Sequence, residues 1–303
     1  MLACARTPNS TQIGLATGWH EDHEVAIRRA AVAGSWYPGT AAALAGAVDR
    51  HLEHAARDAA PVNGDLVALI APHAGLMYSG PVAAHAYRLL QGRVFDLAVL
   101  VGPSHFVGFD GVAVVPDGGF DMPFGTVPID AQCAHALLSG AAVVREHPAA
   151  HAREHSLEMQ LPFLAHLAPG LPIVPLVMGH QTASTACQLG DAIAQVIAGR
   201  HALLIASTDL SHYHAAPDAA ALDRVVVDCV SRFDPDALQA AVERNPEHAC
   251  GGGPTVAVMR AARLAGAREA VVLKYGDSGD VSGDKSAVVG YLAAALGTFT
   301  SRP

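Results

Sequence analysis

The sequence predicts an α/β fold, a single three-layer α/β/α domain with a mostly parallel central sheet. Two observations favour it. Short apolar runs of the length of buried strands recur along the chain, and segments with apolar residues at helical spacing separate several of them. Strands that alternate with helices typically pair in parallel and are covered on both faces. Of the 303 residues, 51% are hydrophobic and 16% are charged, which excludes a disordered chain.

The elements are predicted in chain order. Residues 1–24 are polar and aperiodic, and we interpret them as a flexible N-terminal extension of an α/β domain that spans residues 25–303. The expected strands are Leu66–Ala71, Leu97–Val101, Gly111–Val115, Ile173–Val177, Ala202–Ala206, Ala270–Leu273 and Ser286–Gly290. The expected helices are Ala41–Ala60, Pro81–Leu90, Ala131–Ser139, Ser156–Leu167, Thr182–Ile197, Asp218–Phe233, Pro235–Glu243 and Thr255–Leu264. An extra hairpin or mixed strand is expected near residues 111–130.

Charge and cysteine content restrict the partners and the compartment. The net charge is −9 and no run of Lys or Arg forms a basic stripe, so nucleic acid and anionic membranes are poor partners. The five cysteines are widely spaced without a CxxC pair, which disfavours a disulfide framework and a zinc ribbon. No signal-peptide core or 18-residue apolar run occurs, so no membrane span is expected. We therefore expect a cytoplasmic protein.

Polar side chains follow three of the expected strands, at the point where each strand ends. His73 follows the first strand and His105 the second, whereas Asp209 and His212 follow the strand Ala202–Ala206. The carboxyl ends of parallel strands share one edge of a sheet, where ligands bind. Most of the seventeen histidines are expected on the surface or on helices, but a histidine in a turn just past a buried strand favours a functional role. We expect these four side chains in one cleft.

Cys250 is a further candidate, because it precedes three glycines and Pro254 at the start of an expected helix. A helix N-terminus favours the thiolate, which is the nucleophilic and metal-binding form of cysteine. Two histidines and one anionic ligand are typical of a mononuclear non-haem iron site, whose third ligand is usually a carboxylate. Here either Asp209 or Cys250 could be that third ligand, and a thiolate would suit copper or zinc better.

Two other polar segments have both a functional and a structural interpretation. His151, His155 and Glu158 would share one face of a helix, either as a wall of the cleft or as a solvated helix start. Tyr275 and Asp277 lie in an expected loop and could contribute to the rim of the cleft.

A series of motifs in this chain resembles the Memo family, which includes protein B of the AmmeMemoRadiSam system. The resemblance extends from Arg29 to Tyr291 and leaves out residues 1–24. The motifs that carry it are Ala33–Pro38, Ala71–Gly75, Tyr78–Gly80, Gly102–His105, Glu154–Glu158, Gln160–Pro162, Ser207–His212, Cys250–Pro254 and Val288–Tyr291.

The resemblance implies a fold similar to the class III extradiol ring-cleaving dioxygenases, the LigB-like fold. In those enzymes two histidines and a glutamate bind Fe(2+) and a further histidine is the acid/base. By this resemblance His73 and His105 are metal ligands, Cys250 stands in the place of the glutamate, and His212 is the acid/base with Asp209 beside it. It also implies radical SAM and AMMECR-type partners.

These features lead us to expect a redox-related metal protein that holds iron, or else copper, at His73, His105 and Cys250. The first alternative is an active extradiol-type dioxygenase that acts on an aromatic diol. A second is a cysteine hydrolase in which Cys250 is the nucleophile, His212 the base and Asp209 the residue that orients it. A third is a metal-free module that binds a peptide or a small molecule in the same cleft without turnover.

Overall fold

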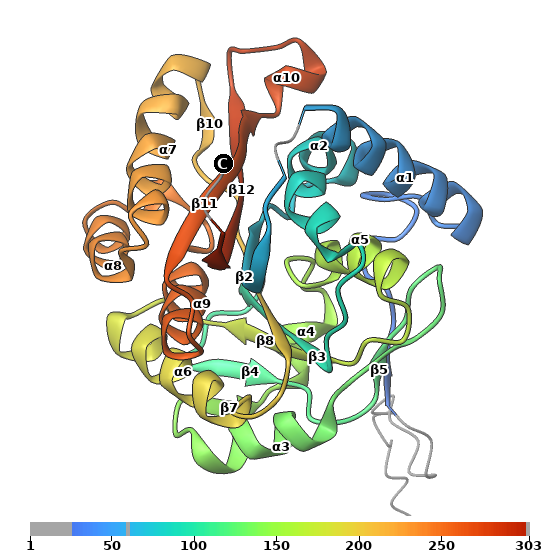
Figure 1. The fold of residues 1–303 in the computed structure, drawn as a ribbon, viewed down its shortest axis with the longest axis vertical. Coiled ribbons are helices and arrows are strands. Elements are labelled where there is room, and N and C mark those ends of the chain that lie inside the picture. The colour runs from blue at the N-terminus through green and yellow to red at the C-terminus, as the bar shows by residue number, and fades with distance from the viewer. Residues whose placement is uncertain (1–25, 59–60, 301–303) are drawn as a thin grey trace, which may run out of the picture.

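The computed structural model describes residues 26–58 and 61–300, and its centre is a nine-stranded mixed sheet (Figure 1). The predicted extension, residues 1–24, lies outside the described residues. Eight strands follow one another across the sheet: β10 (His212–His214), β12 (Val288–Phe299), β2 (Gly64–Ala71), β9 (Ala202–Ser207), β3 (Leu97–Pro103), β8 (Ile173–Met178), β4 (Val112–Val114) and β7 (Val144–Glu146). The ninth strand, β11 (Glu269–Asp277), pairs with β12.

The middle of the sheet is parallel, as the alternation of strands and helices predicts. Strands β2, β9, β3 and β8 pair in parallel and consist largely of buried residues. Antiparallel pairs occur at both margins, where β12 lies against β2 and β4 lies against β8. Because β2, β9 and β3 point the same way, the loops that follow them emerge at one edge.

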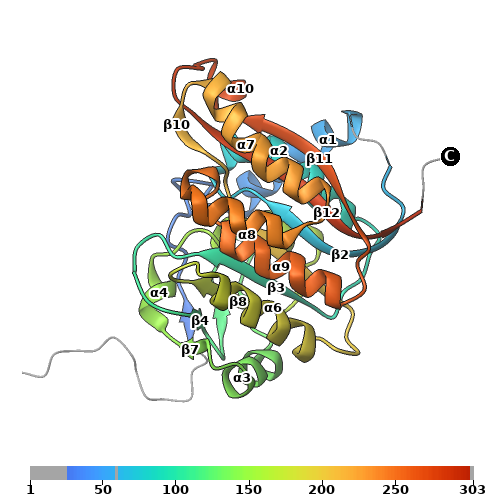
Figure 2. The same ribbon diagram turned by 90° about the vertical axis from the view of Figure 1, so that its left-hand side faces the viewer.

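Helices cover both faces of this sheet, so the three-layer arrangement is confirmed. On one face lie α1, α2 and α5, and on the other α6, α7, α8 and α9 lie side by side (Figures 1 and 2). The helices are α1 (Ala41–Asp58), α2 (Leu76–Tyr87), α3 (Ala131–Gly140), α4 (Pro148–Ala152), α5 (Leu161–Leu167), α6 (Ala183–Val196), α7 (Ala216–Ser231), α8 (Pro235–Arg244), α9 (Gly252–Leu264) and α10 (Gly279–Ser282). Short 3₁₀ turns lie at Arg88–Leu90, Glu158–Gln160 and Pro246–His248.

The last strand is longer than the sequence predicts. The prediction placed a strand at 286–290, but β12 continues to Phe299. Its middle contains Ala293, Ala294 and Ala295, residues that strands usually avoid. All three are fully buried, and β12 contacts α2 on one face and α9 on the other. Small side chains therefore suit this strand because helices approach it closely from both sides.

The expected hairpin near residues 111–130 is present. Strands β5 (Gly119–Phe120) and β6 (Val127–Pro128) form an antiparallel pair, and β1 (Ile27–Arg28) joins β5 in parallel to make a small separate sheet. This sheet fixes the start of the described chain against the body of the protein.

Two predicted helices differ from the structure. Helix α2 begins at Leu76 rather than at Pro81, so that Pro81 lies inside the helix. The segment Ser156–Leu167 is not one helix, because a 3₁₀ turn precedes α5. As α4 ends at Ala152, the predicted shared helical face of His151, His155 and Glu158 is wrong.

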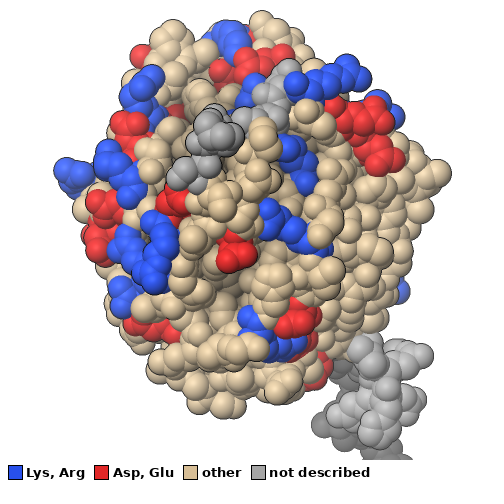
Figure 3. All heavy atoms as spheres, viewed as in Figure 1, with Lys and Arg blue, Asp and Glu red and all other residues tan. Residues whose placement is uncertain are grey.

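None of the helices within residues 26–58 and 61–300 is long and apolar enough to span a membrane. On the face seen in Figure 3, basic and acidic side chains are interspersed and do not gather into one basic patch.

Candidate metal centre

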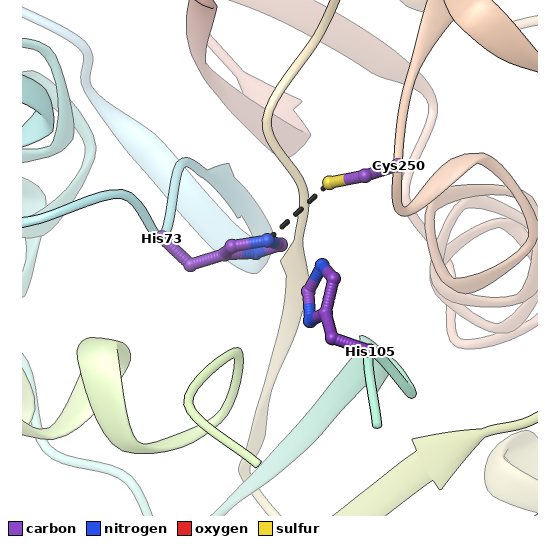
Figure 4. Close-up of side chains that lie close together, drawn as sticks. All are labelled: His73, His105 and Cys250. Carbon is purple, nitrogen blue, oxygen red and sulfur yellow. Dashed lines mark hydrogen bonds between the residues drawn. The ribbon is translucent and has the colours of Figure 1, made fainter. Parts of the chain in front are cut away.

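The side chains of His73, His105 and Cys250 point toward one another at the carboxyl edge of the sheet (Figure 4). His73 follows β2, His105 follows β3, and Cys250 precedes α9. One ligand atom from each lies within 4.8 Å of the other two. The His73 Nε2 atom is 3.3 Å from the Cys250 Sγ atom, and the two imidazole rings are 5.2 Å apart. Three segments that are distant in sequence therefore place three metal-binding groups at one point.

The hydrogen bonds of His73 determine which of its ring nitrogens is free. Its Nδ1 is 2.9 Å from the Ser207 hydroxyl oxygen. That hydroxyl has a single proton, which it donates to the Ser156 carbonyl at 2.6 Å, and it accepts a bond from the Gln160 amide at 2.7 Å. Nδ1 of His73 must therefore be the donor. The Nε2 lone pair is left facing Cys250.

Glu154 determines the free nitrogen of His105 in the same way. The Nδ1 of His105 donates to Glu154 Oε1 at 2.8 Å, and the backbone N–H of His105 donates to Oε2 at 2.6 Å. Although burial raises the pKa of Glu154, the bonds from the His105 ring and backbone bring it down to about 2. A carboxylate that accepts the second N–H of a ligating imidazole orients the ring and increases its basicity.

A second group of metal-binding side chains, His105, Glu154 and His155, is better explained as support for the first. Glu154 accepts four hydrogen bonds, from the His105 ring and from three backbone N–H groups. Oε1 accepts three of these bonds and Oε2 accepts one. The His155 ring stacks on the His105 ring at 4.4 Å. Glu154 and His155 therefore hold His105 in place.

The pKa of Cys250 differs from the expectation. Burial and the neighbouring Asp209 raise the pKa of its thiol, so the prediction of a thiolate favoured by the helix is wrong for the metal-free protein. The helix begins at Gly252, two residues beyond the cysteine. A cation bound at the Sγ atom would reverse this preference, because coordination displaces the thiol proton.

The glycines after Cys250 allow the helix to approach the sheet closely. A Cβ atom on Gly251 would lie 2.5 Å from the carbonyl oxygen of Ser207, and one on Gly253 would lie 2.8 Å from the side chain of Gln181. Larger residues would push the start of α9, and Cys250 with it, away from the histidines.

Asp209 supports the backbone of the centre. Its Oδ1 accepts the backbone N–H of His73 at 2.7 Å and that of Ala74 at 3.3 Å. Burial raises the pKa of Asp209 to about 7. Its own backbone N–H lies 3.3 Å from the Cys250 Sγ atom. Of the two third ligands that the sequence left open, the thiol belongs to the 4.8 Å group and the Asp209 carboxylate does not.

His212 lies close enough to influence both candidate ligands. Burial has the largest effect on the pKa of both His73 and His212 and lowers it. A positive charge on His212 also lowers the pKa of His73, and a positive charge on His105 also lowers the pKa of His212. The Nδ1 of His212 is 2.8 Å from the carbonyl oxygen of Leu210, to which it must donate. The Nε2 of a neutral His212 is therefore a proton acceptor.

The three groups fit a transition-metal ion. Metal–nitrogen bonds of about 2.0 Å and a metal–sulfur bond of about 2.3 Å, arranged tetrahedrally, place the ligand atoms about 3.5 Å apart. The observed separation of 3.3 Å between His73 Nε2 and Cys250 Sγ agrees with this. Two neutral imidazoles and one thiolate leave a coordination position open for a further ligand.

The remaining residues that the sequence suggested for the cleft lie in different parts of the structure. His151 is buried beside Phe120 and belongs to neither group of metal-binding side chains, whereas the His155 ring stacks on that of His105. Tyr275 donates to Asp223 and Asp277 pairs with Lys285, and both line a different cavity.

Sequence reasoning assigned no role to Glu154, Ser207 or Gln160. Their hydrogen bonds to the centre join segments about 50 to 135 residues apart, and no local spacing reveals such bonds.

Comparisons with known proteins identify relatives of this chain. A family model described as Memo-like protein matches residues 28–295. The chain is 39% identical over 272 residues to a MEMO1 family protein of Methanothermobacter thermautotrophicus, covering 88% of this chain and 98% of that protein. It is 38% identical over 275 residues to a MEMO1 family protein of Methanopyrus kandleri, covering 88% and 97%.

A solved structure also resembles the fold. It is the crystal structure of an uncharacterized protein from Escherichia coli K12, with a TM-score of 0.53 and 16% sequence identity, and the match covers 77% of this chain and 100% of that one. This similarity concerns the fold alone. The match of the family model over almost the whole described chain, together with the relatives at 38–39% identity, leads to one conclusion: the chain belongs to the Memo-like, or MEMO1, family.

Proposed function

We propose that the protein binds one redox-active transition metal, iron(II) or else copper, through His73, His105 and Cys250, and uses it in an oxidation–reduction reaction. The observation that carries this proposal is that both imidazoles have Nδ1 engaged by protein groups, so that each can offer Nε2 at the point where the thiol lies. The donor set of two imidazoles and a thiolate suits such a metal.

The metal would supply an electron-transfer centre with an open coordination position, and the surrounding residues would position and deprotonate what enters the cleft. His212 can accept a proton at Nε2, because its Nδ1 is held by a carbonyl. Asp209 keeps the His73 loop in place through two backbone bonds. In this proposal the substrate is a small molecule or a peptide.

A second proposal is the extradiol-type oxidation of an aromatic diol, with His212 as the base that deprotonates a hydroxyl group. The proximity of His212 to His73 and His105 favours it. Oxygen uptake with catechols by anaerobically purified, iron-loaded protein tests it, and no uptake above that of a His212→Ala variant would rule it out.

The contacts do not support the cysteine hydrolase. The thiol of Cys250 contacts His73 rather than His212, and the Oδ1 atom of Asp209 is engaged by backbone N–H groups. A raised thiol pKa also disfavours a free nucleophile.

Metal binding by single-residue variants tests the main proposal. We expect His73→Ala and Cys250→Ser each to lower the affinity for iron(II) and copper more than 100-fold, because even the loss of an outer hydrogen-bond partner costs about 10–100-fold. The matched control is His201→Ala, an exposed histidine on the N-terminal side of β9. Elemental analysis of anaerobically purified protein and metal titration give the result, and wild-type affinity in Cys250→Ser would contradict the proposal.

The proposed association with radical SAM and AMMECR-type proteins rests on the family resemblance. Co-purification of these proteins with the tagged chain from its native host tests it, and their absence from the eluate would contradict it.

A further inference from the structure

A cavity of the described structure lies apart from the metal centre. It lies between α1, α2 and the β11–α10 segment, and its volume is about 600 Å³. None of His73, His105 and Cys250 lines it. Cavities of this size typically hold small organic molecules.

Two cations line this cavity. Arg50 comes from α1 and Lys274 from β11, and both are exposed. Within residues 26–58 and 61–300, neither side chain forms a hydrogen bond or an ion pair with another residue. The chain carries a net charge of −9, so two cations that line one cavity without a direct ion pair differ from the general character of the protein.

Lys285 partly neutralises the carboxylates of the cavity. Asp277 and Asp280 line it near α10, and the Lys285 ammonium contacts both, at 2.7 Å and 2.6 Å. The charge of Lys274 also helps to lower the pKa of Asp280, after the larger effects of burial and of Lys285. The net charge of the five groups, Arg50, Lys274, Lys285, Asp277 and Asp280, is +1.

The wall between these charged groups is partly apolar. Pro81 and Val82 of α2 line the cavity, and so does the ring of Tyr275. The hydroxyl of Tyr275 donates to Asp223, so the ring is held in place. His54 adds an exposed imidazole that can form a hydrogen bond.

From this arrangement we propose that the cavity binds a small organic anion, at a site separate from the metal centre. The anionic group, a carboxylate or a phosphate, lies between Arg50 and Lys274, and the organic part packs on Pro81, Val82 and Tyr275. Guanidinium and ammonium groups form strong charge-assisted bonds with both kinds of anion. Inorganic phosphate alone would leave the apolar wall uncovered, so the ligand has an organic body. This inference does not depend on the proposed metal chemistry.

Lysine labelling tests the proposal directly, because the sequence contains only two lysines, Lys274 and Lys285. The probes are 1-naphthyl phosphate and 1-naphthoate, and the matched uncharged probe is 1-naphthalenemethanol. After brief acetylation, mass spectrometry measures the modification of each lysine. We expect one or both anionic probes to protect Lys274 about fivefold or more, while Lys285, held by two carboxylates, changes little and serves as the internal control. The probe that protects more strongly identifies the anionic group.

Variants locate the site. We expect Arg50→Ala to weaken probe binding about tenfold, whereas Arg57→Ala, an exposed arginine on the same helix outside the lining, does not. Pro81→Phe should abolish protection by filling the cavity, and it removes a proline from a helix interior, so α2 is not disfavoured. Cys250→Ser should bind the probes normally.

Several results would overturn the proposal. These are equal protection by the uncharged probe, protection by neither anionic probe, and full protection in a Pro81→Phe variant that melts like the wild type. Loss of probe binding in Cys250→Ser would place the probes at the metal centre instead. Because the metal titrations use other variants, failure here and failure of the proposed metal function are distinguishable.

Discussion

At the scale of single residues, metal binding at the centre depends on the protonation states of the candidate ligands. His73 and His105 each donate from Nδ1 to a protein acceptor, and the pKa of His73 is lowered well below its ordinary value by burial and by neighbouring imidazoles. The thiol of Cys250 has a raised pKa because it is buried and lies near Asp209. Without metal, His73 is therefore neutral and the thiol keeps its proton.

Metal binding should consequently release about one proton per ion, from Cys250. Since the thiol is protonated below its raised pKa, the apparent affinity should increase with pH, about tenfold per unit between pH 7.5 and 9. Calorimetric titrations in buffers of different ionisation enthalpy measure the proton release. The Cys250→Ser variant is the control, and a pH-independent affinity of the wild type would contradict a thiol ligand.

The burial of His151 leads us to expect that the stability of the fold also depends on pH, separately from metal binding. Burial lowers the pKa of His151 to about 4, although a hydrogen bond with the Ala113 backbone acts in the opposite direction. As pH falls from 6.5 toward 4, the unfolded chain binds a proton that the folded chain does not, so stability is lost. The loss amounts to about 3 kcal/mol.

We expect His151→Leu to remove that part of the acid sensitivity. Urea unfolding at pH 7 and pH 4 measures the difference between the two proteins. The exposed His201→Leu should behave like the wild type, and an unchanged pH dependence in His151→Leu would show that burial does not control this imidazole.

At the scale of elements, one buried carboxylate holds the first described segment of the chain. Glu158 is fully buried and accepts bonds from the backbone N–H groups of Ala31 and Val32, from the Tyr37 hydroxyl and from the Arg28 guanidinium. Arg28 also donates to the carbonyl oxygens of His151 and Glu154. The segment that carries Trp36, whose ring lies 4.4 Å from that of His155, is thereby held beside the metal centre.

Removal of this carboxylate should release the segment. We expect Glu158→Ala to lower the free energy of unfolding by about 3–5 kcal/mol, because it leaves a buried arginine without its partner. Glu158→Gln retains two acceptor positions and should cost less. Urea unfolding and limited proteolysis near residues 28–37 measure the effect, and equal stability of the Ala variant and the wild type would show that the segment is held by other contacts.

At the scale of the whole molecule, the metal centre joins β2, β3 and α9, which belong to different parts of the chain. A metal that binds only the folded state should therefore stabilise the entire domain. At a free concentration 100 times Kd the gain is about 2.7 kcal/mol, which corresponds to a rise in Tm of about 5 °C for a chain of this size.

Thermal unfolding with and without the metal, and after addition of a chelator, measures this effect. The Cys250→Ser variant should show no shift. A similar rise in Tm for that variant would indicate that the metal binds elsewhere.

The sequence by itself determined the alternation of strands and helices, the parallel centre of the sheet and the grouping of His73 and His105. These follow from local patterns, because buried strands are apolar runs and the loops after parallel strands share one edge. The same reasoning, with the family resemblance, brought Cys250 to the same place.

Only the tertiary structure decided what surrounds these ligands. The bonds of Glu154 to His105 and of Ser207 to His73, and the burial that raises the thiol pKa, depend on contacts between distant segments. Packing likewise decided the Ala-rich middle of β12 and the break in the predicted helical segment at residues 151–160, since the intrinsic helix and strand propensities of residues are weak compared with burial between layers. The cavity at Arg50 and Lys274 exists because α1 and β11, more than 200 residues apart, lie on either side of α2.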